Sequence, residues 1–457
     1  MLRFFRINDP YRLVLVFLVL IAIRIIQSFF ISDVSFFGLK WLLLGEWLGK
    51  GFSMYSQAFD YTGPIAAMVY TWLDALAGRS PFLHIAMSTC LIIVQAGIFN
   101  RLLLKNKAYD ENSYLPSFLY MILAVSVPDF MALSPQLMSL TFVLITLGNV
   151  LRRIDNQVTD ELFLNSGIYI GLATMIYIPA VVFFLVFLFS FILFSTAVTR
   201  RLLLYLFGFL LIFALCSLYF YWFDSLSAFI DSFLLEGLFM DVVQVLKFGE
   251  LLLLFSPFIA IFFLAIIKTW TVVRLNNFQQ KVQQVLWLMF FGGLATFFLS
   301  NEKSGHELLF LIPIVCYFWT HYFILIKRRI FRAIMPGLLI FGLLIFSCFS
   351  YGHLTKPLTI EKTSEYIDGV MILGEKLEAY AELQINTPFF NQKISERAVK
   401  GLDYYPSAGV IYELLQKSDP TFIVDEMEIM PKLRARYRFL EENYRRADTN
   451  SYRKINN

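Results

Sequence analysis

The sequence predicts a mainly helical protein that crosses a membrane many times and carries one small water-soluble domain. Of its 457 residues, 58% are apolar and only 16% are charged, whereas about 25% of an average soluble chain is charged. The mean hydropathy is +0.66, and the apolar residues fall in long runs between short charged segments. So few charges cannot coat a water-soluble surface of this size, so a polytopic membrane protein is expected.

The apolar runs predict about eleven membrane spans, because a helix needs about 20 apolar residues to cross the hydrocarbon core. The first run follows a basic N-terminus, but it is longer than a signal peptide's apolar region and no small-residue cleavage motif follows it, which indicates an uncleaved span. Residues 163–198 are divided into two spans because of their length and because Pro179 favours a tight turn. The predicted spans lie near residues 13–31, 82–100, 115–131, 135–151, 163–178, 180–198, 202–221, 250–267, 284–300, 308–326 and 333–351.

The basic residues predict the orientation, because lysine and arginine near span ends are retained on the cytoplasmic side. With the N-terminus inside, seventeen basic residues lie in cytoplasmic segments and five in the opposite loops before the last span. An odd number of spans then places the chain after Tyr351 outside. The seventeen are Arg3, Arg6, Arg12, Arg101, Lys105, Lys107, Arg152, Arg153, Arg200, Arg201, Lys268, Arg274, Lys281, Lys327, Arg328, Arg329 and Arg332. The five are Lys40, Lys50, Arg79, Lys247 and Lys303.

Composition and missing motifs exclude several function classes. The net charge of +4 is too small to indicate a nucleic-acid partner. The four cysteines lie in apolar runs without metal-ligand spacing, which is typical of small buried hydrophobic residues. No P-loop, dinucleotide fingerprint, H-E-x-x-H or G-x-S-x-G motif is present in the sequence. ATP-driven transport, metalloproteolysis and serine hydrolysis therefore have no motif support.

The sequence divides into a membrane domain, residues 1–351, and a soluble extracytoplasmic α/β domain, residues 352–457. The second part carries 15 Lys+Arg and 16 Asp+Glu after residue 352 and has no apolar run long enough to span. Its pattern predicts strands at 369–374 and 421–425, a helix at 375–383 and a longer helix at 432–446. Five arginines of the last helix would form a solvated or membrane-facing surface.

The large first loop, residues 32–81, contains the acids that could carry chemistry. A helix over residues 38–48 is expected to lie along the membrane surface, with Trp41 and Trp47 at the interface, and Gly51, Gly63 and Pro64 would end a compact turn. Three acids accompany it. They are Asp33, Glu46 and Asp60. An acid at the membrane face can act as a general base or hold a divalent cation, and it can equally cap a helix or stay solvated.

Basic residues suggest a second half of a site. Lys303 and His306 lie in the outer turn at residues 301–307, where they could bind a lipid phosphate through charge-assisted hydrogen bonds. Arg79, at the end of the first loop, is a weaker candidate for the same role. Arg24 lies inside the first span, where a charge is costly. Its guanidinium group would either form a structural ion pair or bind a lipid phosphate.

The first loop resembles that of the GT-C glycosyltransferases, which include the protein O-mannosyltransferases and the bacterial aminoarabinose transferases. The resemblance rests on an acid just after the first span, a helix, and then Gly51, Tyr55, Asp60 and Gly63-Pro64 before a second helix. The chain is also similar to a family of polytopic inner-membrane proteins from Bacteroidota-type bacteria. The resemblance implies a GT-C helix bundle in a bacterial inner membrane, with the C-terminal domain in the periplasm.

The resemblance also implies the reaction. A sugar would pass from a polyprenyl-phosphate-linked donor, a membrane lipid, to a periplasmic acceptor beneath the C-terminal domain. Asp33, and after it Asp60 and Glu46, would deprotonate the acceptor or hold a divalent cation as cofactor. Lys303 and His306 would neutralise the leaving phosphate, with Arg79 and Arg24 as further phosphate ligands.

Two other functions remain open from the sequence. Many GT-C members have two adjacent acids after the first span, whereas Asp33 is followed by Val34. This difference favours a non-catalytic scaffold or assembly protein with the same architecture. A lipid or solute transporter is less favoured, because the spans hold few ions beyond Arg24 and the two halves show no repeat.

Overall fold

The computed structural model divides into two compact units that interleave along the chain. Unit 1 comprises Met1–Asp33, His84–Cys216 and Asp241–Pro357. Unit 2 comprises Val34–Leu83, Ser217–Met240 and Leu358–Asn457. The structure describes residues 11–30, 35–109, 113–154, 159–194, 199–239, 243–244, 247–326, 337, 341–346, 348–349, 369–374, 377–381, 383, 385–391, 394–395, 405–448 and 450–455.

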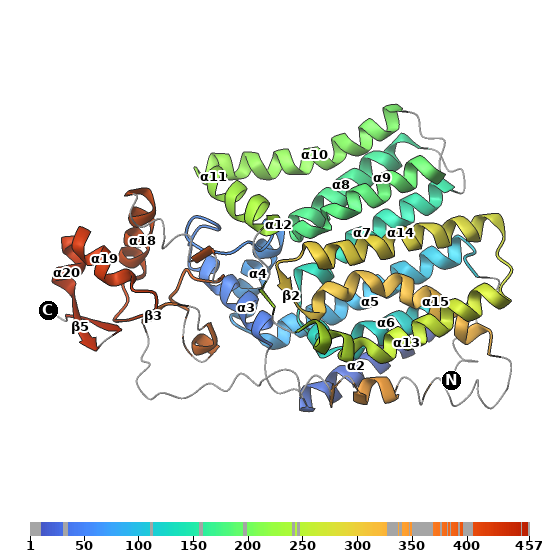
Figure 1. Cartoon of the computed structure of the whole chain (residues 1–457), viewed down its shortest axis with the longest axis horizontal. Coiled ribbons are helices and arrows are strands. Elements are labelled where there is room, and N and C mark those ends of the chain that lie inside the picture. Colours follow the sequence, from blue (N-terminus) through green and yellow to red (C-terminus); the bar gives the residue numbers. More distant parts are fainter. Residues whose placement is uncertain are drawn as a thin grey trace. The chain divides into compact units, whose positions relative to one another are not determined.

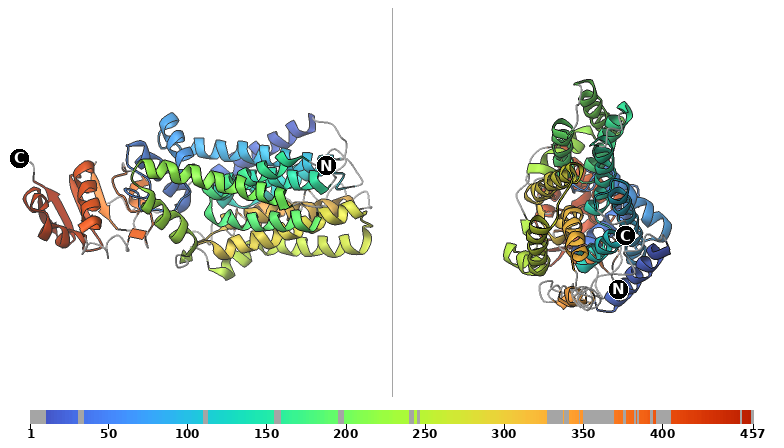
Figure 2. Two further views of the ribbon diagram at one scale, coloured as in Figure 1. Left: turned by 90° about the horizontal axis from the view of Figure 1, so that it is seen from above. Right: turned by 90° about the vertical axis from the view of Figure 1, so that its right-hand side faces the viewer.

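Unit 1 is a bundle of apolar helices that lie roughly side by side (Figures 1 and 2). Its helices are α2 (Tyr11–Phe30), α5 (Pro81–Lys105), α6 (Leu115–Ser126), α7 (Pro135–Ile154), α8 (Asp160–Ile176), α9 (Val182–Phe194), α10 (Thr199–Trp222), α13 (Phe248–Val272), α14 (Asn277–Leu299) and α15 (Ile312–Ile324). Shorter 3-10 turns are η1 (Pro128–Met131), η2 (Ile178–Val181) and η4 (Gly305–Leu311), and β1 (Val243–Gln244) pairs with β2 (Glu302–Lys303).

The described helices confirm a polytopic membrane bundle. Among the described residues, six helical segments are long and apolar enough to cross a membrane. They are Pro81–Lys105, Pro135–Ile154, Thr199–Trp222, Phe248–Val272, Asn277–Leu299 and Gly305–Ile324. Shorter apolar helices lie at the predicted spans 13–31, 115–131 and 180–198, and α8 lies at 163–178. The predicted span at 333–351 lies mostly outside the described residues. The exact number of crossings and their orientation stay predictions.

The predicted break near Pro179 is confirmed. Helix α8 ends at Ile176, and Tyr177 has an extended backbone, with φ −146° and ψ 105°. Pro179 lies at the start of η2, where its missing N–H costs no helical hydrogen bond. The apolar stretch therefore forms two helices, α8 and α9.

Glycines bring α8 and α10 into close contact. A Cβ atom added at Gly167 would lie 2.1 Å from the carbonyl oxygen of Tyr205, and one at Gly208 would lie 2.4 Å from that of Leu164. Larger side chains at these positions would push the two backbones apart. Small residues at such crossings are typical of helices that pack within a membrane.

Unit 2 begins with two helices of the first loop, α3 (Phe36–Gly49) and α4 (Pro64–Ala77). The helix predicted over 38–48 is confirmed, and Pro64 opens α4 as expected. The interfacial role predicted for two tryptophans is wrong. Trp41 is 4% exposed and Trp47 is fully buried, and Trp47 stacks on Phe52 with ring centroids 3.7 Å apart. These side chains hold the loop together because they pack against the chain itself.

A helical segment between α10 and α13 also belongs to unit 2. It consists of α11 (Leu226–Phe229), a π-helical turn η3 (Ile230–Glu236) and α12 (Gly237–Phe239). Tyr55 of the first loop packs on this segment, with ring centroids 5.8 Å from Phe229 and 6.3 Å from Phe233. Distant parts of the sequence thus share one core.

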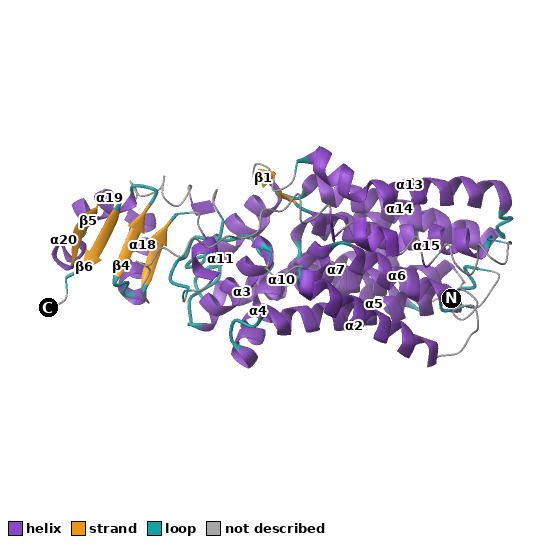
Figure 3. Cartoon of the chain, turned by 90° about the horizontal axis from the view of Figure 1, so that it is seen from below, coloured by secondary structure: helices purple, strands orange, loops and turns teal. Residues whose placement is uncertain are grey.

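The C-terminal residues form a four-stranded mixed sheet with helices beside it (Figure 3). Its strands are β3 (Val370–Leu373), β4 (Phe422–Asp425), β5 (Tyr444–Asp448) and β6 (Ser451–Lys454), in the order β3-β4-β6-β5. Strands β3 and β4 are parallel, and the other neighbours are antiparallel. The strands predicted at 369–374 and 421–425 are therefore confirmed. The helices are η5 (Leu377–Ala381), α18 (Tyr405–Ser418), α19 (Ile429–Arg436) and α20 (Arg438–Asn443).

The single helix predicted at 432–446 is wrong. Tyr437 has an extended backbone, with φ −115° and ψ 102°, and separates α19 from α20. Arg445 and Arg446 lie on β5, where they pair with Arg453 and Tyr452 of β6. Pairing with a strand later in the chain outweighs the local helical pattern.

The first loop and the C-terminal residues pack together inside unit 2. The backbone N–H of Phe59 donates to the carbonyl oxygen of Pro388 at 2.8 Å, and that of Asn391 donates to Phe59 at 3.0 Å. The predicted domain boundary between residues 351 and 352 lies outside the described residues, and the two-domain division stays a prediction.

Candidate functional site

Asp60 lies at the turn before α4 and is fully buried. Its Oδ1 atom lies 2.9 Å from Nζ of Lys40, whose side chain is only 2% exposed. The hydroxyl of Thr62 donates to the other carboxylate oxygen. A buried pair of this kind loses much of its hydration, so each charge depends on the other. These contacts indicate that Asp60 anchors the first loop.

Glu46 of α3 also lies among cations. Its Oε2 atom accepts a hydrogen bond from Nε of Arg79 at 2.8 Å, and its Oε1 atom lies 3.0 Å from Nζ of Lys50. The backbone N–H of Ile385 donates to the same Oε1 atom at 3.2 Å. The structure thus joins a predicted base, Glu46, with a predicted phosphate ligand, Arg79. Together they tie the first loop to C-terminal residues within unit 2.

Asp74 of α4 lies in the same charged group. Burial, and then the charge of Glu46, raise the pKa of Asp74 above its usual value, while Arg79 and Lys50 oppose the rise. The sequence analysis did not single out this acid. Asp33, the first choice as catalytic base, lies outside the described residues.

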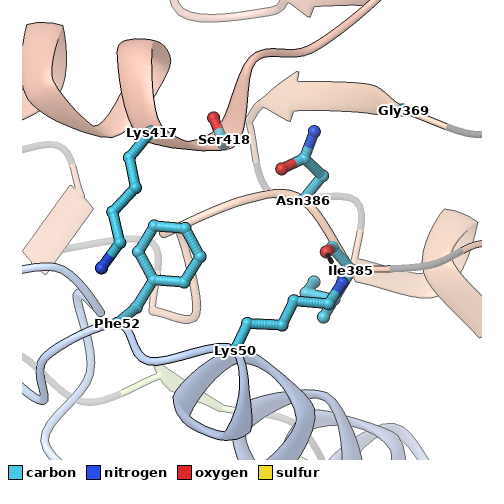
Figure 4. A pocket seen from close by; sticks show the side chains of 7 residues that line it. All are labelled: Lys50, Phe52, Gly369, Ile385, Asn386, Lys417 and Ser418. Carbon is cyan, nitrogen blue, oxygen red and sulfur yellow. Dashed lines mark hydrogen bonds between the residues drawn. The ribbon is translucent and has the colours of Figure 1, made fainter.

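Unit 2 contains a polar pocket of about 320 Å³. Figure 4 shows the side chains of Lys417 and Lys50 on either side of Phe52. Nζ of Lys417 donates to the carbonyl oxygen of Gly51 at 2.8 Å and lies 4.3 Å from the Phe52 ring centroid. Asn386 adds an amide to the lining. The pocket combines positive charge with neutral hydrogen-bonding groups.

In unit 1, two turns that follow predicted spans are bonded to each other. The Oδ2 atom of Asp129, in η1, accepts a hydrogen bond from the backbone N–H of Gly305, the first residue of η4, at 3.1 Å. A Cβ atom added at Gly305 would lie only 2.6 Å from that oxygen. This position therefore requires glycine. His306 follows directly, is 1% exposed and lies within electrostatic range of Asp129.

Glu307 completes a buried polar cluster. It is 1% exposed, and its Oε1 atom accepts a hydrogen bond from Nε2 of Gln136 at 2.8 Å. The hydroxyl of Tyr177, at the break between α8 and η2, donates to Oε2. The sequence analysis missed Asp129, Gln136, Tyr177 and Glu307 as a group, because their elements are far apart in the chain. The acidic end of the 301–307 turn was the only local signal.

Lys303 binds the end of the preceding helix. Its Nζ donates to the carbonyl oxygens of Phe297, of Phe298 at 3.1 Å and of Ser300 at 2.7 Å. A cation that satisfies the last carbonyls also interacts well with the negative end of the helix dipole. Burial lowers the pKa of Lys303, and the charge of Glu307 opposes that effect. The three carbonyl oxygens thus provide one acceptor for each ammonium proton of Lys303.

Arg24 lies beside the same η1 turn. Its side chain is 4% exposed, and Nη2 donates to the carbonyl oxygen of Phe130 at 3.0 Å. Among the described residues, its Nε and Nη1 atoms reach no acceptor and no carboxylate pairs with it. The sequence left two roles open for Arg24, a structural ion pair or a lipid phosphate. Among the described residues, Arg24 does not form the ion pair. Buried donors without an acceptor are costly, which is typical of a site built for an anion.

Unit 1 also contains an apolar cavity of about 370 Å³. It lies among α6, η1, α13, α14, η4 and α15, and every lining side chain is apolar. Phe130, whose carbonyl oxygen binds Arg24, lines it. Phe297 also lines it, and its ring centroid lies 4.9 Å from Nζ of Lys303.

The described residues offer no ready ligand set for a divalent cation. No group of three or more His, Cys, Asp or Glu side chains among them could hold a metal ion. Lys40 holds Asp60, and Arg79 and Lys50 hold Glu46. These two carboxylates therefore do not fit a metal centre.

No family model and no curated protein sequence matches this chain. Solved structures do resemble it. ArnT from Cupriavidus metallidurans bound to undecaprenyl phosphate gives a TM-score of 0.59 at 10% identity, with 98% of this chain and 99% of that chain covered. The same protein in the apo state gives 0.57 at 10% identity, with 96% and 97% covered.

The archaeal oligosaccharyltransferase AglB from Archaeoglobus fulgidus, in complex with an inhibitory peptide and a dolichol-phosphate, gives a TM-score of 0.48 at 10% identity. That alignment covers 98% of this chain and 75% of that chain. ArnT is a GT-C membrane glycosyltransferase. The likeness to ArnT along nearly the whole of both chains shows that this chain has the GT-C fold.

Proposed function

We propose that this chain, which has the GT-C fold, is a membrane glycosyltransferase that moves a sugar from a polyprenyl-phosphate-linked donor to a periplasmic acceptor. The observation that carries the proposal lies within unit 1. There Phe130 both lines an apolar cavity and accepts a hydrogen bond from Arg24, a buried arginine with two donors that reach no acceptor among the described residues. That arrangement suits a lipid whose hydrocarbon chain ends in a phosphate.

The proposed topology has eleven crossings, with the N-terminus in the cytoplasm of a bacterial cell and the C-terminal domain in the periplasm. Contacts within unit 1 agree with it. Arg24, near the end of α2, contacts η1, which follows α6, and η1 contacts η4, which follows α14. In the proposed topology these three segments all end on the periplasmic side. The distribution of basic residues supports the same orientation.

The lipid tail is assigned to the apolar cavity and the phosphate to Arg24. The cavity suits a hydrocarbon tail because its lining side chains are all apolar, so the tail leaves no buried polar group without a partner. The guanidinium fork matches two phosphate oxygens, and Lys303 adds positive potential although its protons bind carbonyl oxygens. In the sequence, His306 lies two residues before Leu308, which lines the cavity. The ArnT structure bound to undecaprenyl phosphate supports a donor of this class.

The proposed reaction is a single displacement at the anomeric carbon of the sugar. A bond forms from the acceptor oxygen to that carbon, and the bond from the carbon to the phosphate oxygen breaks. The leaving polyprenyl phosphate gains negative charge, which Arg24 and Lys303 stabilise. The acceptor proton passes to a first-loop carboxylate.

Asp33 is the proposed base, because the other two first-loop acids are held by cations. Asp60 and Glu46 are assigned to positioning the loop, since each carboxylate pairs with a basic neighbour. Arg79 acts with Glu46 in that role.

A non-catalytic scaffold with the same fold is the second candidate. The observation that favours it is that Asp60 and Glu46 are bonded within the loop, as structural acids are. A scaffold would keep the bundle and the loop but transfer no sugar. The two functions differ in what an Asp33→Asn variant does.

The donor site is tested by native mass spectrometry of the full-length protein with added undecaprenyl phosphate. Arg24→Gln is expected to weaken binding about tenfold to a hundredfold, because hydrogen bonds to charged groups are worth about 1.5–3 kcal/mol. Arg274→Gln, an exposed arginine in the α13–α14 turn, is the matched control and should bind as the unaltered protein does. Equal binding by the Arg24 and Arg274 variants would remove the donor-site assignment.

Catalysis is tested in cells by measuring lipid-linked sugars. Asp33→Asn is expected to let the donor accumulate while the purified variant keeps its unfolding temperature. If donor levels stay unchanged when the whole gene is deleted, the transferase proposal fails and the scaffold remains.

A further inference from the structure

A second cavity of unit 1 is larger and polar. It has a volume of about 570 Å³ and lies between the ends of α5 and α7 and the start of α8. Three cations line it, Arg101, Lys105 and Arg152, against one acid, Glu161. The proposed glycosyl transfer uses none of these residues.

The lining offers fixed polar groups and an unused donor. Asn106 and Asn149 are each 7% exposed. Their amide nitrogens donate to the carbonyl oxygen of Leu102 at 2.7 Å and to Oγ of Ser166 at 3.1 Å. The Nε atom of Arg152 is buried and reaches no acceptor within the described ranges. A buried N–H without an acceptor is costly, so an anion in the cavity would relieve it.

Helix dipoles alone do not explain the cluster. The last turns of α5 and α7 favour cations such as Lys105 and Arg152, because helix C-termini carry partial negative charge. Arg101, however, lies four residues before Lys105 on the same face of α5, and like charges at this spacing repel each other. Both side chains line the same cavity. An anion bound between the two side chains would attract both of them and offset their mutual repulsion.

We propose that this cavity binds the phosphate group of an anionic membrane lipid. The two arginines offer planar forks that match phosphate oxygens, and the asparagines can hydrogen-bond the polar part of the headgroup. All three cations belong to the segments that the charge distribution assigns to the cytoplasmic side. Basic pockets between helix ends on that side of a membrane are suited to anionic headgroups. The site lies at the opposite ends of the helices from the proposed donor phosphate.

The test is native mass spectrometry of the full-length protein with phosphatidylglycerol, phosphatidylcholine or inorganic phosphate added separately. The unaltered protein is expected to retain phosphatidylglycerol in preference to the other two. The double variant Arg101→Gln/Arg152→Gln should bind phosphatidylglycerol about 10- to 30-fold more weakly, from the loss of two basic residues at the headgroup level.

The matched control is Lys107→Gln/Arg200→Gln. It removes two charges from the same predicted side of the membrane at residues that do not line the cavity. The control should bind phosphatidylglycerol as the unaltered protein does, and equal losses in both double variants would overturn the site. Inorganic phosphate that binds as tightly as the lipid would overturn the lipid assignment. If the arginine variant does not fold, Lys105→Gln, at an exposed position, must still weaken binding, and an unchanged affinity overturns the proposal.

Discussion

Asp60 shows how one residue can carry a functional pattern and a structural contact at once. Its place before Gly63-Pro64 predicts a catalytic acid, yet its carboxylate lies 2.9 Å from a buried lysine. Transfer of an acceptor proton to this carboxylate would leave the buried Lys40 without its partner. The pair therefore contributes more to the conformation of the loop than to proton transfer.

Replacement of Asp60 by asparagine is expected to destabilise the protein. Removal of one partner of a buried ion pair costs about 3–5 kcal/mol, so the unfolding temperature of Asp60→Asn should fall clearly. Asp231→Asn, an exposed acid of the same unit, is the control and should unfold like the unaltered protein. The second change Lys40→Met should restore part of the stability. A variant with unchanged unfolding but no transfer would instead identify Asp60 as the base.

At the scale of elements, the two turns η1 and η4 form the polar end of the membrane bundle. Neither turn alone predicts a site. Their contact through Asp129 and Gly305 brings Arg24, the buried glutamate and the end of α14 to one part of unit 1. Three helices therefore contribute to the proposed phosphate site through their ends.

Gly305→Ala is expected to separate these turns. The added Cβ would lie 2.6 Å from Oδ2 of Asp129, and overpacking of this kind costs about 1–3 kcal/mol. Both the unfolding temperature and the retention of undecaprenyl phosphate should decrease. Gly97→Ala, where an added Cβ meets nothing within 4 Å, should leave both unchanged. Retention of the lipid by a destabilised Gly305 variant would show that the turn contact does not shape the donor site.

At the scale of the whole molecule, the order of the chain and its compact units differ. Unit 2 combines the first loop, the segment after α10 and the C-terminal residues. The first loop gains its own core from these later parts through Tyr55 and Phe59. A truncation before the C-terminal sheet would therefore remove contacts of the loop that carries the candidate acids.

The predicted orientation can be tested on the intact chain. A reporter enzyme that is active only in the periplasm should be active when fused after Asn457 and inactive when fused after Lys107. The reason is that seventeen basic residues lie in the predicted cytoplasmic segments against five in the opposite loops. Activity at both positions, or at Lys107 alone, would contradict the eleven-span topology.

The sequence alone determined the membrane class, the positions of most helices and the break at Pro179, because hydrophobicity and proline geometry act locally. It also indicated the GT-C fold through the first loop, and the two C-terminal strands through their short apolar runs. Its helix at 432–446 is wrong because β6, the partner of β5, also pairs with β4 much earlier in the chain, and a local pattern does not show that pairing. Only the tertiary structure decided that Lys40 neutralises Asp60 and that Glu46 binds Arg79. Only it linked Arg24 to an apolar cavity through Phe130, because such sites arise where helices distant in sequence pack together.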